Sequence, residues 1–137
     1  MARGIRAEDF NELNEVALFM GQLFEKYRTM ETGDLRALID KGERFLLIDA
    51  RGPGEFAGGH ICGAVNIPVE CVERDISGLA DTEGLVVVYA GDSLSAQSVV
   101  AVDKLHTLGY DKVLRYAGGL KEWKKAGLCV EGLNKAA

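Results

Sequence analysis

Apolar residues follow two different spacings along the chain, and these spacings predict its strands and helices. Residues 45–50 (FLLIDA) and 85–90 (LVVVYA) are apolar runs of strand length, as expected for strands covered on both faces of a sheet. Shorter runs at 64–68 and 112–117 are further candidate strands. Helical segments are expected between and after them, at about 70–78, 94–108 and 119–126.

Two helices are expected before the first strand. Residues 8–28 carry apolar side chains at a sustained three- or four-residue spacing, which predicts an amphipathic helix of roughly five turns. A shorter helix is expected over about 32–41, with Thr32 or Asp34 near its N-terminal cap and Gly42 ending it.

Strands that alternate with helices predict an α/β fold, with a mostly parallel sheet and helices on both of its faces. At 137 residues the chain has the length of one domain. We expect an N-terminal helical extension, 1–29, followed by a single domain, 30–134. Ligands of such sheets bind at the carboxyl ends of strands, which here are the ends of 45–50 and 85–90.

The loop after the strand 85–90 has the composition of an anion-binding loop without a nucleophile. Small residues lead from this strand into the next helix, so several backbone N–H groups should face one concavity at the helix N-terminus. Enzymes use this arrangement to hold a cysteine thiolate, but position 90 is alanine, Asp92 adds a negative charge, and no lysine or arginine occurs from 91 to 102. The candidate loop residues are Ala90, Gly91, Asp92, Ser93, Leu94, Ser95 and Ala96.

Serine nucleophiles are a weak alternative in this region. Ser93, Ser95 and Ser98 would each need a general base, and nothing in the sequence links them to His60 or His106. Helix capping and hydrogen bonds within the loop are the favoured roles of these serines.

A second polar cluster lies between residues 49 and 64. Its members Asp49, Arg51, Glu55 and His60 could form an acid–base set, or they could form an ion-paired, hydrogen-bonded turn beside the loop. We favour the turn, because the glycine and proline positions between these residues are typical of turns.

Composition excludes several classes of function. The net charge of −5 and the lack of a basic run argue against nucleic acid as a partner. No apolar stretch could span a membrane, and no secretory signal is apparent, so we expect a cytoplasmic protein. No metal, nucleotide or flavin motif is present, and no cofactor is expected. Cys62, Cys71 and Cys129 are odd in number and lack a C-x-x-C spacing, which favours three reduced thiols over disulfides or zinc ligands; a redox or persulfide-accepting thiol is the alternative.

Two motifs resemble those of the rhodanese-like domain, the sulfurtransferase family. Residues 49–64 match D-x-R-x-x-x-E-[YF]-x-x-G-H-I-x-G-A, and residues 109–123 match GY-x-x-V-x-x-[LY]-x-GG-x-x-x-W. The resemblance covers about residues 30–132. It implies a five-stranded α/β domain whose active-site loop follows the central strand.

The resemblance also implies what the loop should contain. A family member takes a sulfane sulfur from a donor such as thiosulfate onto a loop cysteine and passes it to an acceptor, and the matching position here is Ala90. Ser95 stands where relatives commonly have a polar or basic residue. Cys62 falls at a variable position of the first motif, Cys71 follows the next strand, and Cys129 stands where relatives often have proline.

Three hypotheses follow from the alanine at position 90. The chain could be an inactive rhodanese-like module with a binding or regulatory role. It could be an active sulfurtransferase whose cysteine was replaced by alanine in this chain. It could also be an enzyme that uses another thiol, Cys62 or Cys71, brought near the loop by the fold.

The candidate partners are a protein or a small sulfur-containing ligand. The apolar stripe of residues 8–28 must be covered by its own domain, by a second copy or by another protein. Self-association through this helix, which would give a homodimer, is the partner interaction that we predict.

Overall fold

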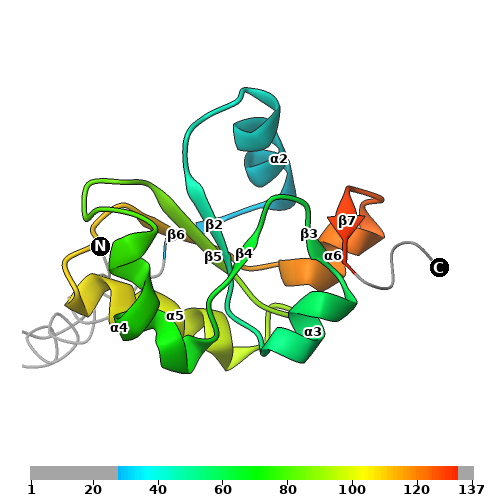
Figure 1. Ribbon diagram of the computed structural model, residues 1–137. Coiled ribbons are helices and arrows are strands. Elements are labelled where there is room, and N and C mark those ends of the chain that lie inside the picture. The colour runs from blue at the N-terminus through cyan, green and yellow to red at the C-terminus, as the bar shows by residue number, and fades with distance from the viewer. Residues whose placement is uncertain (1–27, 133–137) are drawn as a thin grey trace, which may run out of the picture.

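A computed structural model describes residues 28–132 of the chain. Strands and helices alternate through this region, as the sequence predicts (Figure 1). The elements, in chain order, are β1 (Thr29–Met30), α2 (Thr32–Asp40), β2 (Leu46–Asp49), α3 (Pro53–Gly58), β3 (His60–Ile61), β4 (Val65–Asn66), η1 (Val69–Cys71), α4 (Val72–Asp75), η2 (Ile76–Gly78), β5 (Val86–Tyr89), α5 (Ala96–Thr107), β6 (Val113–Tyr116), α6 (Gly119–Lys125) and β7 (Val130–Glu131).

The main sheet has five strands in the order β1-β6-β5-β2-β4. Every neighbouring pair in it is parallel, so the expected five-stranded parallel sheet is confirmed. β5 is its central strand, with Tyr89 opposite Asp49 of β2. The two polar regions that the sequence singled out therefore begin side by side at the carboxyl edge of the sheet.

Each face of the sheet packs against its own helices (Figure 1). Val86 and Val88 of β5 belong to a buried cluster with residues of α4 and α5. Val87 and Tyr89 belong to a second cluster with residues of α2 and α6. Successive side chains of a strand point to opposite faces, which explains why an uninterrupted apolar run was needed to fill both clusters.

The predicted strands and helices coincide with observed ones to within a few residues, but the sequence missed some short elements. β1 is the fifth strand and is only two residues long, too short for a periodic signal. The glycine-rich segment after Arg51 was expected to form turns, and this expectation was wrong, because Pro53–Gly58 is the helix α3. Proline at the first helical position is compatible with a helix, since that position needs no N–H donor.

Beyond the main sheet, β3 and β7 form a small antiparallel pair, in which His60 lies opposite Glu131 and Ile61 opposite Val130. The predicted helix over 8–28 lies outside the described residues, and the division into 1–29 and 30–134 stays a prediction. Within residues 28–132, no helix is long and apolar enough to cross a membrane.

Candidate functional site

The loop from 90 to 96 connects the central strand β5 to the N-terminus of α5. Ala90, the first residue after the strand, is 1% exposed, so its methyl group lies at the base of the loop. Leu94, near the loop's tip, is 92% exposed. The loop therefore has a buried base at Ala90 and an apolar tip, Leu94, in solvent.

The N-terminus of α6 holds the base of this loop. The backbone N–H groups of Leu120 and Lys121 donate to the carbonyl oxygens of Ala90 and Gly91, each at 2.9 Å. This close approach requires glycine at 119, where φ is +67° and a Cβ atom would lie 2.6 Å from the oxygen of Ala90. Gly119, the second glycine of the GG pair, therefore allows α6 to lie close to the backbone of the loop.

Asp92 is used within the loop itself. Its Oδ1 accepts a hydrogen bond from the N–H of Leu94 at 3.0 Å, and its carbonyl oxygen accepts one from the N–H of Ser95 at 3.2 Å. An aspartate in this arrangement stabilises a turn. Ser95 is the N-terminal cap residue of α5, yet its hydroxyl donates to the side chain of Gln97 at 3.2 Å and not to the helix backbone.

Arg115 is a loop contact that the sequence reasoning missed. It extends from β6, where its Nε donates to Oγ of the buried Ser98 at 2.8 Å and its Nη2 donates to the carbonyl oxygen of Ser93 at 3.0 Å. Burial lowers the pKa of Arg115 from its ordinary value. Arg115 lies outside the 91–102 segment that borders the loop, and its sequence signal is an arginine within the predicted strand 112–117.

Asp49 and Arg51 form a buried ion pair beside the loop. The carboxylate of Asp49 receives Arg51 Nε at 3.0 Å and Nη2 at 2.8 Å. Nη2 of Arg51 also donates to the carbonyl oxygen of Gly59 at 2.7 Å. Burial opposes the charge of Arg51, but the hydrogen bond and charge of Asp49 outweigh it and raise the pKa of Arg51.

The ion pair is connected to the loop by hydrogen bonds to Tyr89, the last residue of β5. The N–H of Ala50 donates to the carbonyl oxygen of Tyr89 at 2.9 Å, and the phenol of Tyr89 accepts the N–H of Ile61 at 3.0 Å. Burial, and then the charge of Asp49, raise the pKa of Tyr89. Asp49 and Arg51 are therefore placed to support the strand end from which the 90–96 loop departs.

The other two members of the predicted cluster make hydrogen bonds within the segment 52–60. Nδ1 of His60 donates to the carbonyl oxygen of Phe56 at 2.7 Å, and the two rings stack with centroids 3.6 Å apart. Glu55 is exposed, and its Oε1 accepts the N–H of Gly52 at 3.4 Å at the start of α3. The structure joins Asp49 to Arg51 by hydrogen bonds, whereas Glu55 acts on Arg51 through its charge and His60 is bonded to Phe56.

The expectation of three reduced thiols was wrong. Cys62 and Cys129 form a disulfide with their Cα atoms 5.6 Å apart. The antiparallel pairing of Ile61 with Val130 places the two cysteines side by side. They are 67 residues apart in sequence, so residue spacing alone could not reveal the pair.

Cys71 is the free cysteine among the described residues. It ends η1 and packs against the buried cluster of α4 and α5. Because Cys62 is disulfide-bonded, it offers no thiolate in this state. Within residues 28–132, no group of three or more histidine, cysteine or acidic side chains could hold a metal ion.

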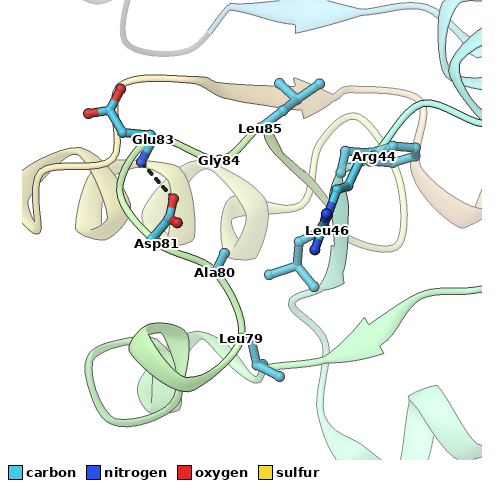
Figure 2. Close-up of a pocket in the computed structure, with 9 residues that line it drawn as sticks. Arg44, Leu46, Leu79, Ala80, Asp81, Glu83, Gly84 and Leu85 are labelled. Atoms are coloured by element: carbon cyan, nitrogen blue, oxygen red, sulfur yellow. Dashed lines mark hydrogen bonds between the residues drawn. The ribbon is translucent and has the colours of Figure 1, made fainter.

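A pocket of about 620 Å³ lies elsewhere, between the segments 44–46 and 79–85 (Figure 2). These segments precede or begin β2 and β5, so the pocket lies at the amino edge of the sheet. The loop at its rim is closed by the N–H of Glu83, which donates to Asp81 at 3.1 Å. Ligands of parallel sheets bind at the opposite, carboxyl edge, and the candidate site remains the 90–96 loop.

Comparison with known proteins gives one consistent match. Residues 31–126 match the family described as Rhodanese-like domain. The thiosulfate sulfurtransferase 16 of Arabidopsis thaliana is 30% identical over 102 residues, which span 66% of this chain and 82% of that protein. The uncharacterized protein YqhL of Bacillus subtilis is 33% identical over 96 residues, which span 70% of this chain and 71% of that protein.

Coverage differs among the relatives. The uncharacterized protein slr1261 of Synechocystis is 36% identical over 83 residues, which span 61% of this chain but only 45% of that protein. Among solved structures, the rhodanese-like domain of Alr3790 from Anabaena has a TM-score of 0.70 at 30% identity and covers 79% of this chain and 81% of that one. BH2092 from Bacillus halodurans has a TM-score of 0.75 at 25% identity, with 91% and 89% covered.

Proposed function

Because this chain belongs to the rhodanese-like domain family, as its match over residues 31–126 establishes, we propose that it is a binding or regulatory member that does not transfer sulfur. The observation that carries the proposal is Ala90, the residue directly after the central strand. Sulfur transfer through an enzyme persulfide needs a thiolate that attacks the sulfane sulfur of the donor. A methyl group has no electron pair with which to form that bond.

The surrounding loop supports a binding role. α6 anchors the carbonyl oxygens of Ala90 and Gly91, and Arg115 contributes a guanidinium group that donates to the carbonyl oxygen of Ser93. A Cβ atom at Gly91 would have no atom within 4 Å, so there is open space beside the loop base. A small sulfur-containing anion such as thiosulfate is the ligand class that we propose for it.

A protein partner is the second part of the proposal. Leu94 presents a large apolar side chain that is 92% exposed at the tip of the loop. Contact with another molecule would remove this apolar side chain from water, which is favourable. Self-association through residues 8–28 also stays a proposal, since this segment lies outside the described residues.

The alternative is an active sulfurtransferase whose natural cysteine was replaced by alanine at position 90. What favours it is the intact anchoring of the loop base by Leu120 and Lys121. The relatives include proteins named as thiosulfate sulfurtransferases. Under this alternative, restoring the thiol should restore transfer.

Thiosulfate:cyanide sulfur transfer by three forms of the chain distinguishes these proposals. The unmodified chain and Ala90→Ser, the matched control with an oxygen in place of sulfur, should both be inactive. Strong activity in Ala90→Cys would favour the alternative, whereas an inactive Ala90→Cys with an unchanged circular dichroism spectrum would favour a site that has lost transfer altogether. Activity in the unmodified chain would overturn both proposals and implicate another thiol, which Cys71→Ala would then test.

A further inference from the structure

The disulfide between Cys62 and Cys129 lies at the rim of the domain and not in its main sheet. It follows β3 and precedes β7, the two-residue strands that form a separate pair beside α6 (Figure 1). Cys129 is exposed and Cys62 is half-buried. A thiol from solution can therefore approach the Cys129 sulfur without unfolding the five-stranded sheet.

One chain of contacts leads from Cys129 to the 90–96 loop through α6. The carbonyl oxygen of Cys129 accepts the N–H of Cys62 at 3.2 Å and the indole N–H of Trp123 at 2.8 Å. Trp123 lies in α6, one turn after the residues whose N–H groups hold the loop base. Displacement of Cys129 would thus release a hydrogen bond from the helix that anchors the loop.

A second chain of contacts leads from Cys62 through the central strand. Ile61, its neighbour, is fully buried and donates its N–H to the phenol of Tyr89 at 3.0 Å. Tyr89 immediately precedes Ala90. The two cysteines are therefore connected to the loop base from two independent sides.

We propose that Cys62 and Cys129 form a reversible thiol–disulfide couple that sets how firmly the loop base at 90–91 is held. In the reducing direction, a small thiolate attacks the sulfur of Cys129, the more exposed of the two cysteines, forms a mixed disulfide and expels the Cys62 thiolate, which takes up a proton. A second thiol then attacks the mixed disulfide, leaves as the small-molecule disulfide and releases Cys129 as a thiol. Two electrons pass from the small thiols to the protein, and an oxidised small thiol reverses the steps.

Reduction should loosen this region without unfolding the domain. The main sheet and both buried clusters contain neither cysteine of the pair. Once the covalent link is gone, the contacts between β3 and β7 include two residue pairs, the N–H of Cys62 to the oxygen of Cys129 at 3.2 Å, the N–H of Gly63 to Glu131 at 3.0 Å, and Nε2 of His60 3.5 Å from Glu131. Ile61 and Val130 also pack in the cluster that α6 shares. So small an antiparallel pair has little stability of its own, so without the disulfide its position depends on these few contacts.

The full chain carrying Cys71→Ala tests the couple, because this variant keeps only the paired cysteines. Equilibration in buffers of reduced and oxidised dithiothreitol should convert a form without reactive thiols into a form with two. Trp123 is the chain's one tryptophan, so its emission should shift to the red in step with the thiol count. Cys62→Ala and Cys129→Ala in the same background should show no redox-dependent shift.

Amide hydrogen exchange tests the connection to the loop. On reduction, the amides of Leu120 and Lys121 should exchange roughly two- to tenfold faster, the factor that corresponds to one weakened hydrogen bond. The amides of Val87 and Val88, in the central strand, should keep their rates and thereby exclude global unfolding. Unchanged rates at Leu120 and Lys121, or two reactive thiols in the air-oxidised variant, would overturn the inference.

The proposed redox couple acts on the same loop as the proposed function. Its test measures thiol content, fluorescence and amide exchange, and requires neither a ligand nor an activity assay. If the couple titrates as expected and the sulfur-transfer experiment contradicts the binding role, the redox inference stands alone. If the couple is absent, the proposed function is unaffected.

Discussion

At the scale of single residues, Arg115 changes the electrostatic description of the loop. The 91–102 segment lacks a basic residue and contains Asp92, which on its own would oppose an anionic ligand. Arg115 comes from β6 and contacts both Ser93 and Ser98, so it supplies a positive charge from a different element. The loop's conformation and charge therefore both depend on a residue that is distant in sequence.

Replacing this arginine should destabilise the domain. Arg115→Met removes two hydrogen bonds from a charged donor and should lower the free energy of unfolding by about 1 to 2 kcal/mol. Ser98→Ala should cost about 1 kcal/mol, because it leaves Nε without its acceptor, and the double variant should cost less than the sum of the two. Urea denaturation provides these values.

Arg36→Met is the matched control for this measurement. Arg36 pairs with Asp40 at 3.5 Å on the surface of α2, where both side chains are more than half exposed. Such pairs contribute little to stability. If Arg115→Met were as neutral as Arg36→Met, the contacts of Arg115 with the loop would not be stabilising.

Tyr89 should make stability depend on alkaline pH. Burial and the nearby charge of Asp49 raise the pKa of its phenol in the folded chain, whereas the unfolded chain ionises this group near pH 10. The stabilisation is complete below the unfolded pKa and is lost as pH rises from there through the folded pKa. The free energy of unfolding should thus fall above about pH 10.

Urea denaturation between about pH 9 and pH 11 checks this slope. Tyr89→Phe should be less stable at neutral pH, since it loses the acceptor for the N–H of Ile61, but its stability should fall less steeply in alkali. Burial also raises the pKa of Tyr116, so a residual slope is expected. Equal slopes in both proteins would contradict the prediction for Tyr89.

At the scale of elements, the contact between α6 and the β5–α5 connection forms the site. The fit depends on Gly119, where a Cβ atom would lie 2.6 Å from the oxygen of Ala90 and 2.9 Å from the nitrogen of Asp92. Both are backbone atoms, so relief requires α6 or the loop to move. The glycine pair of the second motif is therefore a packing requirement between two elements.

Gly119→Ala should be much more harmful than a comparable change at Gly127. Both glycines have positive φ, +67° and +74°, but a Cβ atom at Gly127 would have no atom within 4 Å. Gly127→Ala should cost about 1 to 2 kcal/mol from backbone strain alone, and Gly119→Ala should cost at least about 2 kcal/mol more, as an overpacked contact does. Thermal denaturation of the two variants compares them directly, and equal losses would show that the loop does not depend on this contact.

At the scale of the whole molecule, the disulfide connects the segment after β3 to the segment before β7, near the C-terminal end of the described residues. The two cysteines are 67 residues apart. Closing a loop of this length lowers the conformational entropy of the unfolded chain, which stabilises the fold by about 4 kcal/mol. Cys62→Ala/Cys129→Ala should therefore unfold at lower urea concentration than the unmodified chain, with a similar circular dichroism spectrum before unfolding. Cys71→Ala leaves the disulfide intact and is the control. Its free energy of unfolding should fall by less than that of the double variant.

Adding reductant separates the covalent contribution from that of the side chains. Dithiothreitol should lower the stability of the unmodified chain and of Cys71→Ala, but not that of the double variant. A double variant as stable as the unmodified chain would mean that the disulfide adds nothing to the fold.

The sequence predicted the longer strands and helices but not β1 or α3, because the signals of the longer elements are local. Apolar runs at 45–50 and 85–90 predicted the two central strands, and the segments between and after the predicted strands were expected to be the helices that are α5 and α6. The two motifs then indicated the family, and Ala90 could be placed directly after the central strand from its position alone. These inferences required no knowledge of which segments touch.

Only the tertiary structure decided which distant residues make up the site. Strand pairing places Asp49 beside Tyr89, and β6 brings Arg115 into contact with Ser93 of the loop. The pairing of β3 with β7 brings Cys62 next to Cys129. None of these contacts has a spacing that repeats along the chain, because each depends on the order and register of strands in the folded sheet. The sequence alone places Ala90 at the base of the loop, whereas only the folded structure shows which groups hold the loop in position.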